Sequence, residues 1–133
     1  MNRPVTGVAA ALLLAVSVPG QAHHSFAAEY DRARTITVSG TVTKLEWTNP
    51  HARVYVDGKD ETGKQQVWDF ELGPPNGLMR NGWSRNSLKN GDKVVVEGFR
   101  SKLAVDGANA RSVTMADGKR VFAGSSAENP ATQ

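Results

Sequence analysis

The sequence contains no cysteine in its 133 residues. This excludes a disulfide framework and a thiolate metal site. Because cysteine gives no information on the cellular compartment, only the N-terminal export signal can indicate it. Histidine is also scarce, with three in the whole chain. Lys and Arg number 16 against 13 Asp and Glu, which gives a net charge of +3. Nucleic-acid-binding domains cluster many basic side chains, and this surplus is small, so we expect no nucleic-acid partner.

Long apolar runs are also missing, apart from one at residues 8–18. That run is shorter than the roughly 20 residues of a membrane-spanning helix. Arg3 precedes it, Pro19 and Gly20 break it, and small residues stand at positions 20 and 22. This order is typical of a removable signal peptide. We therefore predict a periplasmic protein, cleaved after Ala22, with no stable membrane insertion after cleavage; an uncleaved membrane anchor is the alternative.

The chain beyond the signal peptide is long enough for one domain. We divide the sequence into a signal peptide at 1–22, an N-terminal arm at 23–34, a β-rich domain at 35–123 and a disordered tail at 124–133. The arm lacks strand periodicity, apart from a short helical turn expected near Phe26. The tail is small and polar, as disordered segments are.

Apolar and polar residues alternate with period two in most of the domain, which predicts strands. The expected strands span residues 35–42, 53–57, 66–72, 93–99, 110–115 and 120–123. After Val42 the alternation shifts by one residue: the apolar residues up to Val42 have even numbers, whereas Leu45 and Trp47 have odd numbers. Such a shift indicates a bulge in the strand. Between 76 and 89 the period becomes helical. The pattern predicts an all-β fold, a small OB-like barrel of five to six strands with one short helical segment between the third and fourth strands. A short β-sandwich or an open meander is the alternative.

The three histidines are the candidate metal ligands: His23 and His24 at the predicted new N-terminus, and His51 in a turn. A free amine and the imidazole of the same residue can chelate Cu(II), which favours nitrogen ligands. Copper fits better than zinc because no thiolate or carboxylate cluster accompanies the histidines. The alternative is that His23 and His24 are solvated and that His51 orients its turn through hydrogen bonds.

Two segments, 47–53 and 75–85, combine Trp, Asn and Arg beside turn residues. Partly exposed Trp and Arg provide rigid contact surface and forked hydrogen-bond donors. The candidate ligand-binding residues are Trp47, Asn49, Arg53, Asn76, Arg80, Trp83 and Arg85. The alternative places the tryptophans in the core and lets Arg80 and Arg85 neutralise Asp69 and Glu71.

Catalytic signals are weak. There is no Gly-x-Ser-x-Gly motif, and residues 73–77 contain too much proline for a phosphate-binding loop. Asp69 and Glu71 alternate onto one strand face and form a candidate carboxylate pair, but solubilising charge is the favoured interpretation. We therefore predict no enzymatic activity and name no catalytic residue.

Five segments together resemble a known group of proteins: residues 23–26, 46–51, 68–73, 76–83 and 91–98. They are similar to small exported bacterial proteins that are catalogued as a domain family of unknown function. The resemblance covers about residues 23–123. It implies a periplasmic, barrel-like protein and supplies no activity, cofactor or catalytic residue.

Two functional hypotheses arise from these observations. The first is a non-enzymatic periplasmic binding module for a small ligand or a partner protein. The second is a copper-binding protein that uses His23 with His24 or His51. Copper is the one cofactor that the residues suggest.

Overall fold

The computed structural model describes residues 26–124. Its elements in chain order are α1 (Phe26–Glu29), β1 (Tyr30–Glu46), β2 (Arg53–Asp60), β3 (Gln65–Glu71), α2 (Pro75–Arg80), β4 (Lys93–Ser101), β5 (Gly107–Met115) and β6 (Arg120–Phe122). The fold is all-β with short helices, as the period-two pattern predicts. Within residues 26–124, no helix is long and apolar enough to cross a membrane.

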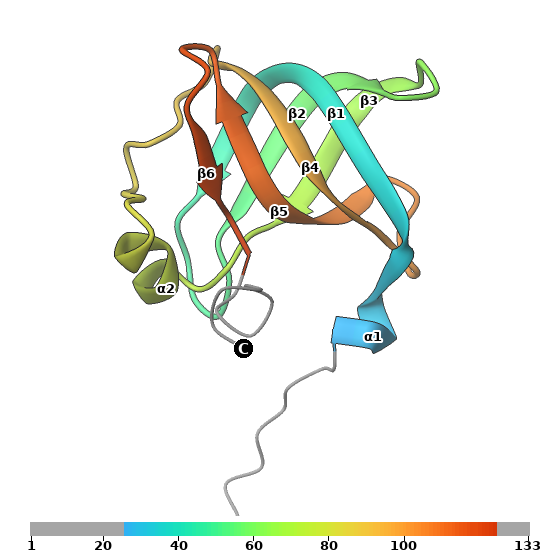
Figure 1. Ribbon diagram of the computed structural model, residues 1–133, viewed down its shortest axis with the longest axis horizontal. Helices are drawn as coiled ribbons and strands as arrows, with labels where there is room; N and C mark the ends of the chain where they lie inside the picture. Colours follow the sequence, from blue (N-terminus) through green and yellow to red (C-terminus); the bar gives the residue numbers. More distant parts are fainter. Residues whose placement is uncertain (1–25, 125–133) are drawn as a thin grey trace, which may run out of the picture.

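The six strands form one sheet that returns to itself as a ring (Figure 1). Their order is β3-β2-β1-β4-β5-β6, and β3 also pairs with β5. The β3–β5 pairing is parallel, whereas the other pairings are antiparallel. The long strand β1 makes the ring possible, because it pairs with β2 along one part and with β4 along another. Its register shifts between Val42 and Lys44, where the sequence predicts a bulge.

Two glycines let β1 and β2 approach closely at the bend of the ring. Gly40 and Gly58 are register partners. A Cβ atom on Gly40 would collide with the carbonyl oxygen of Asp57, and one on Gly58 would lie 2.5 Å from that of Ser39. Side chains do not fit at either position, so glycine is required here by close packing rather than by an unusual φ angle.

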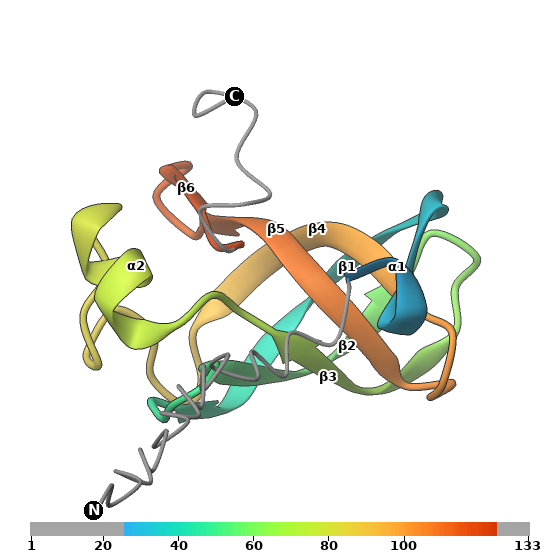
Figure 2. The same ribbon diagram turned by 90° about the horizontal axis from the view of Figure 1, so that it is seen from below.

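The core fills the inside of the ring with every second residue of each strand. The largest fully buried side chains are Trp68, Phe70, Ile36, Leu72, Leu78, Val38, Val42, Val54, Val56, Val96 and Val113. At one end of the ring α2 provides Leu78, and the segment after α2 adds Trp83 (Figure 2). The Trp83 Nε1–H donates to the carbonyl oxygen of Phe122 at 2.8 Å, which satisfies the polar atom of this buried ring.

The start of β1 and the length of α2 differ from the predictions. Strand β1 begins at Tyr30, so residues 30–34 of the predicted arm belong to the sheet. Their placement depends on contacts that are distant in sequence: Tyr30 pairs with Ser101 of β4, and the Phe26 ring packs 5.7 Å from that of Phe99. Helix α2 ends at Arg80 because Gly82 turns the chain with φ of 88°.

Candidate functional site

Polar side chains gather on the outer surface of β1, β2 and β3. Glu46, Arg53 and Glu71 are register partners in one row across the three strands, and Lys44, Tyr55 and Asp69 form the next row. They face outward because alternate residues, such as Val54 and Val56, fill the core. We call these six residues, together with His51 from the loop before β2, the outer polar face.

Glu71 is the centre of this face. Its Oε1 atom lies 2.8 Å from Nδ1 of His51, and its Oε2 atom accepts a hydrogen bond of 2.9 Å from the hydroxyl of Tyr30. Nη1 of Arg53 lies 3.7 Å from the same Oε2 atom. Burial, followed by the negative charge of Glu71, raises the pKa of Tyr30 well above its usual value, so this hydroxyl stays protonated and donates.

His51 is oriented by this carboxylate. Its Nδ1 atom faces Glu71, at an ion-pair distance of 2.8 Å from Oε1. The His51 side chain is 42% exposed. Since Nδ1 faces Glu71, Nε2 is the ring nitrogen that a ligand group or a metal ion would meet.

Asp69 carries an acceptor that no residue of the described chain satisfies. Its Oδ1 atom is buried and has no hydrogen-bond partner. Nε of Arg53 lies 3.4 Å away, an ion-pair distance without hydrogen-bond geometry. Burial raises the pKa of Asp69, the charge of Arg53 opposes this shift, and nearby carboxylates including Glu71 reinforce it. Asp69 therefore keeps an acceptor atom that has no partner among residues 26–124.

The opposite edge of the face is more exposed and already paired. Nζ of Lys44 donates to Oε1 of Glu46 at 2.5 Å, and the hydroxyl of Tyr55 donates to Oε2 of Glu46 at 3.3 Å. The hydrogen bond from Lys44 lowers the pKa of Glu46, and burial is the main cause that raises the pKa of Tyr55. The face therefore has three carboxylates and two cations, with a tyrosine ring between them.

Of the residues predicted to bind a ligand, only Arg53 belongs to the outer polar face. Trp47 packs partly buried against the core, and Asn49 is exposed in the β1–β2 loop. Trp83 is only 3% exposed and is a core residue, in agreement with the alternative given for the tryptophans. The remaining three, Asn76, Arg80 and Arg85, are exposed on α2 and the segment after it.

The two predicted segments lie near each other but do not form one site. Hydrogen bonds from Ala52 to Gly73 and from Leu72 to Ala52 place the β1–β2 loop beside the chain that leads into α2. Within the described residues, neither Arg80 nor Arg85 forms an ion pair. The interpretation that they neutralise Asp69 and Glu71 is wrong, because Arg53 of the neighbouring strand has that role.

The predicted metal ligands are only partly described. His23 and His24 lie outside the described residues, and His51 is the one predicted ligand that the structure places. Residues 26–124 contain no group of three or more His, Cys, Asp or Glu side chains that could hold a metal ion.

Sequence reasoning missed two tyrosines of this region. Tyr55 could have been found, because it alternates with the buried Val54 and Val56 and so must face outward. Tyr30 carried no local signal, since its contact with Glu71 depends on how the first turn folds over the ring.

A model of a family of unknown function (DUF6152) matches residues 10–110. The chain belongs to this family. The match includes the whole outer polar face, Tyr30 and all three histidines, and it confirms the resemblance to a domain family of unknown function. No curated protein and no solved structure matches the chain.

Proposed function

We propose that this protein is an exported, periplasmic, non-enzymatic binding module for a small ligand or a partner protein, and that it binds through the outer polar face. The signal-peptide pattern of residues 1–22 supports export. The observation that carries the choice of face is the buried, unsatisfied Oδ1 atom of Asp69.

The strand order supports a finer description of the fold, an OB-like barrel. The ring β1-β2-β3-β5-β4 with a parallel β3–β5 pair agrees with a five-stranded barrel, and α2 stands between β3 and β4. In OB folds the surface of strands 2 and 3 and the adjacent loops bind ligands. The outer polar face occupies the corresponding surface, which supports the proposal by analogy of fold only.

The ligand chemistry follows from Asp69. A buried acceptor without a partner costs about 1–3 kcal/mol, which a donor from a ligand would recover. The donor is an ammonium, a guanidinium or a hydroxyl group, because the face has more carboxylates than cations. Tyr55 offers an aromatic surface for the apolar part of the ligand, and Nε2 of His51 offers a second acceptor.

NMR titration of the processed protein with three probes, n-butylammonium, methylguanidinium and chitotriose, tests this proposal. At least one probe should bind the wild type and bind Asp69→Asn at least about tenfold more weakly, since an amide is a poorer acceptor for a cation or hydroxyl. Asp117→Asn, in the exposed β5–β6 turn, is the matched control and should bind like the wild type. Equal affinity of wild type and Asp69→Asn for every probe would contradict the choice of face.

The second candidate function is copper binding, and the orientation of His51 by Glu71 favours it. Metal-binding histidines usually have a carboxylate beside their other ring nitrogen, and Nδ1 of His51 lies 2.8 Å from Oε1 of Glu71. A chain of contacts also leads from His51 to the beginning of the described chain: Glu71 contacts Tyr30, whose ring lies 5.3 Å from that of Phe26.

Cu(II) titration of the protein cleaved after Ala22 tests this alternative. Wild type should bind at submicromolar concentration, and both His23→Ala and His51→Ala should weaken binding at least about tenfold. A loss confined to His23→Ala would leave only a chelate at the terminus and remove His51 from the site. Equal, weak binding by all three proteins would contradict the copper function.

A further inference from the structure

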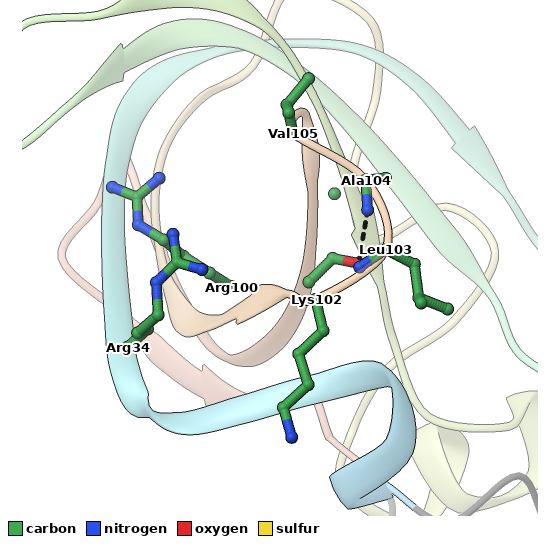
Figure 3. Close-up of a pocket in the computed structure, with 8 residues that line it drawn as sticks. Arg34, Arg100, Lys102, Leu103, Ala104 and Val105 are labelled. Carbon is green, nitrogen blue, oxygen red and sulfur yellow. Dashed lines mark hydrogen bonds between the residues drawn. The ribbon is translucent and has the colours of Figure 1, made fainter.

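A pocket of about 170 Å³ opens between the start of β1 and the loop that joins β4 to β5 (Figure 3). It is lined by Arg34 of β1, by Arg100 and Ser101 of β4, and by residues 102–105 and Gly107. It lies at the end of the ring away from α2, beside α1 (Figures 1 and 2). The mouths of such rings are common ligand sites. No residue of the outer polar face lines this pocket, although Gly107, which lines it, is the register partner of Asp69.

Arg100 is held rigidly at this pocket. Its guanidinium carbon lies 5.7 Å from the ring centre of the buried Trp68. Its Nη2 atom donates to Oδ2 of Asp60 at 3.0 Å and to Oε1 of Glu61 at 2.9 Å. Both carboxylates thus contact the same nitrogen, and the other guanidinium N–H groups are left for further acceptors. The two carboxylates balance the charge of Arg100, and the guanidinium fixed in this way contributes N–H donors to an anion rather than net positive charge.

The other charged groups of the pocket are also cationic. Arg34 is exposed and forms no ion pair with any described residue, and Figure 3 shows its guanidinium beside that of Arg100. Nζ of Lys102 donates to the carbonyl oxygen of Ala27, and Lys102 forms no ion pair with any residue of the described range. None of the residues that line the pocket is acidic, and the neighbouring Asp106 does not line it.

Apolar side chains share this pocket with the three cations. Leu103 is 76% exposed and Val105 is 83% exposed, more than any other large apolar side chain in the described chain. Both line the pocket. The loop that presents them is ordered by Ser101, whose Oγ accepts hydrogen bonds of 3.0 Å from the backbone N–H groups of Leu103 and Ala104. Exposed aliphatic side chains beside cations indicate a ligand that has both an apolar part and an anionic part.

We propose that this pocket binds an anionic amphiphile, with its phosphate or carboxylate head at Arg34 and Arg100 and its hydrocarbon chain against Leu103 and Val105. The volume fits a head group of this kind but not the chain, which would lie along the exposed loop. A free amphiphile and an anionic lipid within a bilayer both combine an anionic head with a hydrocarbon chain.

Fluorescence and NMR titrations with decyl phosphate, below its micelle-forming concentration, test the proposal. Wild type should bind decyl phosphate at least about tenfold more tightly than inorganic phosphate, because burial of a few methylene groups adds to the anion contact. Arg34→Gln and Leu103→Ser should each weaken binding of decyl phosphate about tenfold or more. Both residues are exposed, so we expect both variants to fold.

Two matched control variants remove a positive charge or an apolar side chain at surface positions outside the pocket. Lys89→Gln deletes one exposed positive charge, and Met79→Ser deletes an apolar side chain that is 52% exposed on α2. Both should bind decyl phosphate like the wild type. No binding by the wild type, or equal affinity of all variants, would overturn the proposal. Equal affinity of the wild type for decyl phosphate and inorganic phosphate would overturn the proposed contact of the hydrocarbon chain with Leu103 and Val105.

Vesicle flotation distinguishes the two sources of the ligand. If the protein takes the lipid from a bilayer surface, it should float with phosphatidylglycerol vesicles and not with phosphatidylcholine vesicles, and Arg34→Gln and Leu103→Ser should stay in solution. Binding of decyl phosphate without flotation would assign the pocket to a free amphiphile. Equal flotation with both kinds of vesicle would contradict recognition of the anionic head.

Discussion

The hydrogen bond from Tyr30 to Glu71 allows a quantitative test of how the first turn is attached to the outer polar face. Tyr30→Phe removes the hydroxyl that donates at 2.9 Å and leaves the ring, which is 7% exposed, in place. A hydrogen bond to a charged group contributes about 1.5–3 kcal/mol. Because His51 and Arg53 continue to contact Glu71, we expect a loss at the lower end, about 1.5 kcal/mol.

A double-mutant cycle with Glu71→Gln separates this bond from the other effects of each substitution. Urea unfolding is followed by tryptophan fluorescence, since Trp68 and Trp83 are buried in the native ring. The coupling free energy between positions 30 and 71 should be about 1 kcal/mol. Coupling below about 0.3 kcal/mol, the level of independent sites, would refute the contact.

The burial of Tyr30 beside Glu71 also makes stability depend on pH in the alkaline range. The pKa of Tyr30 is raised in the folded protein by burial and by Glu71, whereas the unfolded chain ionises near its ordinary value of 10.0. Above that pH the unfolded state releases a proton that the folded state keeps, so the free energy of unfolding falls as pH rises. Tyr30→Phe should flatten this decline, and a variant with the wild-type slope would contradict the assignment.

Three further substitutions test other parts of the fold and the face. Gly40→Ala should destabilise the ring by about 1–3 kcal/mol in thermal unfolding, because its Cβ meets the backbone of Asp57; a wild-type melting temperature would contradict this. Hydrogen bonds, first from Thr62, lower the pKa of Asp60, so its contribution to stability is present above pH 3.8 and is lost as pH falls. In urea unfolding, Asp60→Asn should be less stable than the wild type at pH 7, and its stability should change less at acid pH; equal acid dependence would contradict this. Burial raises the pKa of Asp69, which means that the folded state does not favour its charge. In the same assay at pH 7, Asp69→Asn should therefore lower the free energy of unfolding by less than about 0.5 kcal/mol, and a larger loss would mean that Asp69 supports the fold.

Local periodicity carried most of the fold prediction. The alternation in residues 53–57 and 93–99 marked β2 and β4, and the phase slip after Val42 marked the bulge of β1. The parallel β3–β5 pair that closes the ring has no local signal, because it joins residues that are far apart in the sequence. For the same reason the first part of β1 resembles an arm in the sequence: its order comes from pairing with β4.

The candidate site was harder to predict than the strands. The sequence singled out His51 as a metal ligand and Arg53 as a ligand-binding residue, and both stay predictions; it also placed Asp69 and Glu71 on one face of a strand, as the register of β3 confirms. Whether such charges are solvated or paired depends on the neighbouring strand, and the register partners of β3 supply Arg53. Composition alone favoured Arg80 and Arg85, which are exposed on α2 and on the segment after it.

Binding of a donor-bearing ligand at the outer polar face is tested most directly by a map of backbone amide shifts. On addition of n-butylammonium, methylguanidinium or chitotriose to the wild type, the perturbed amides should cluster at Arg53, Tyr55, Asp69 and Glu71, on two strands that are paired in register. Perturbations confined to the β4–β5 loop, or scattered over the surface without a cluster on β2 and β3, would contradict binding at this face.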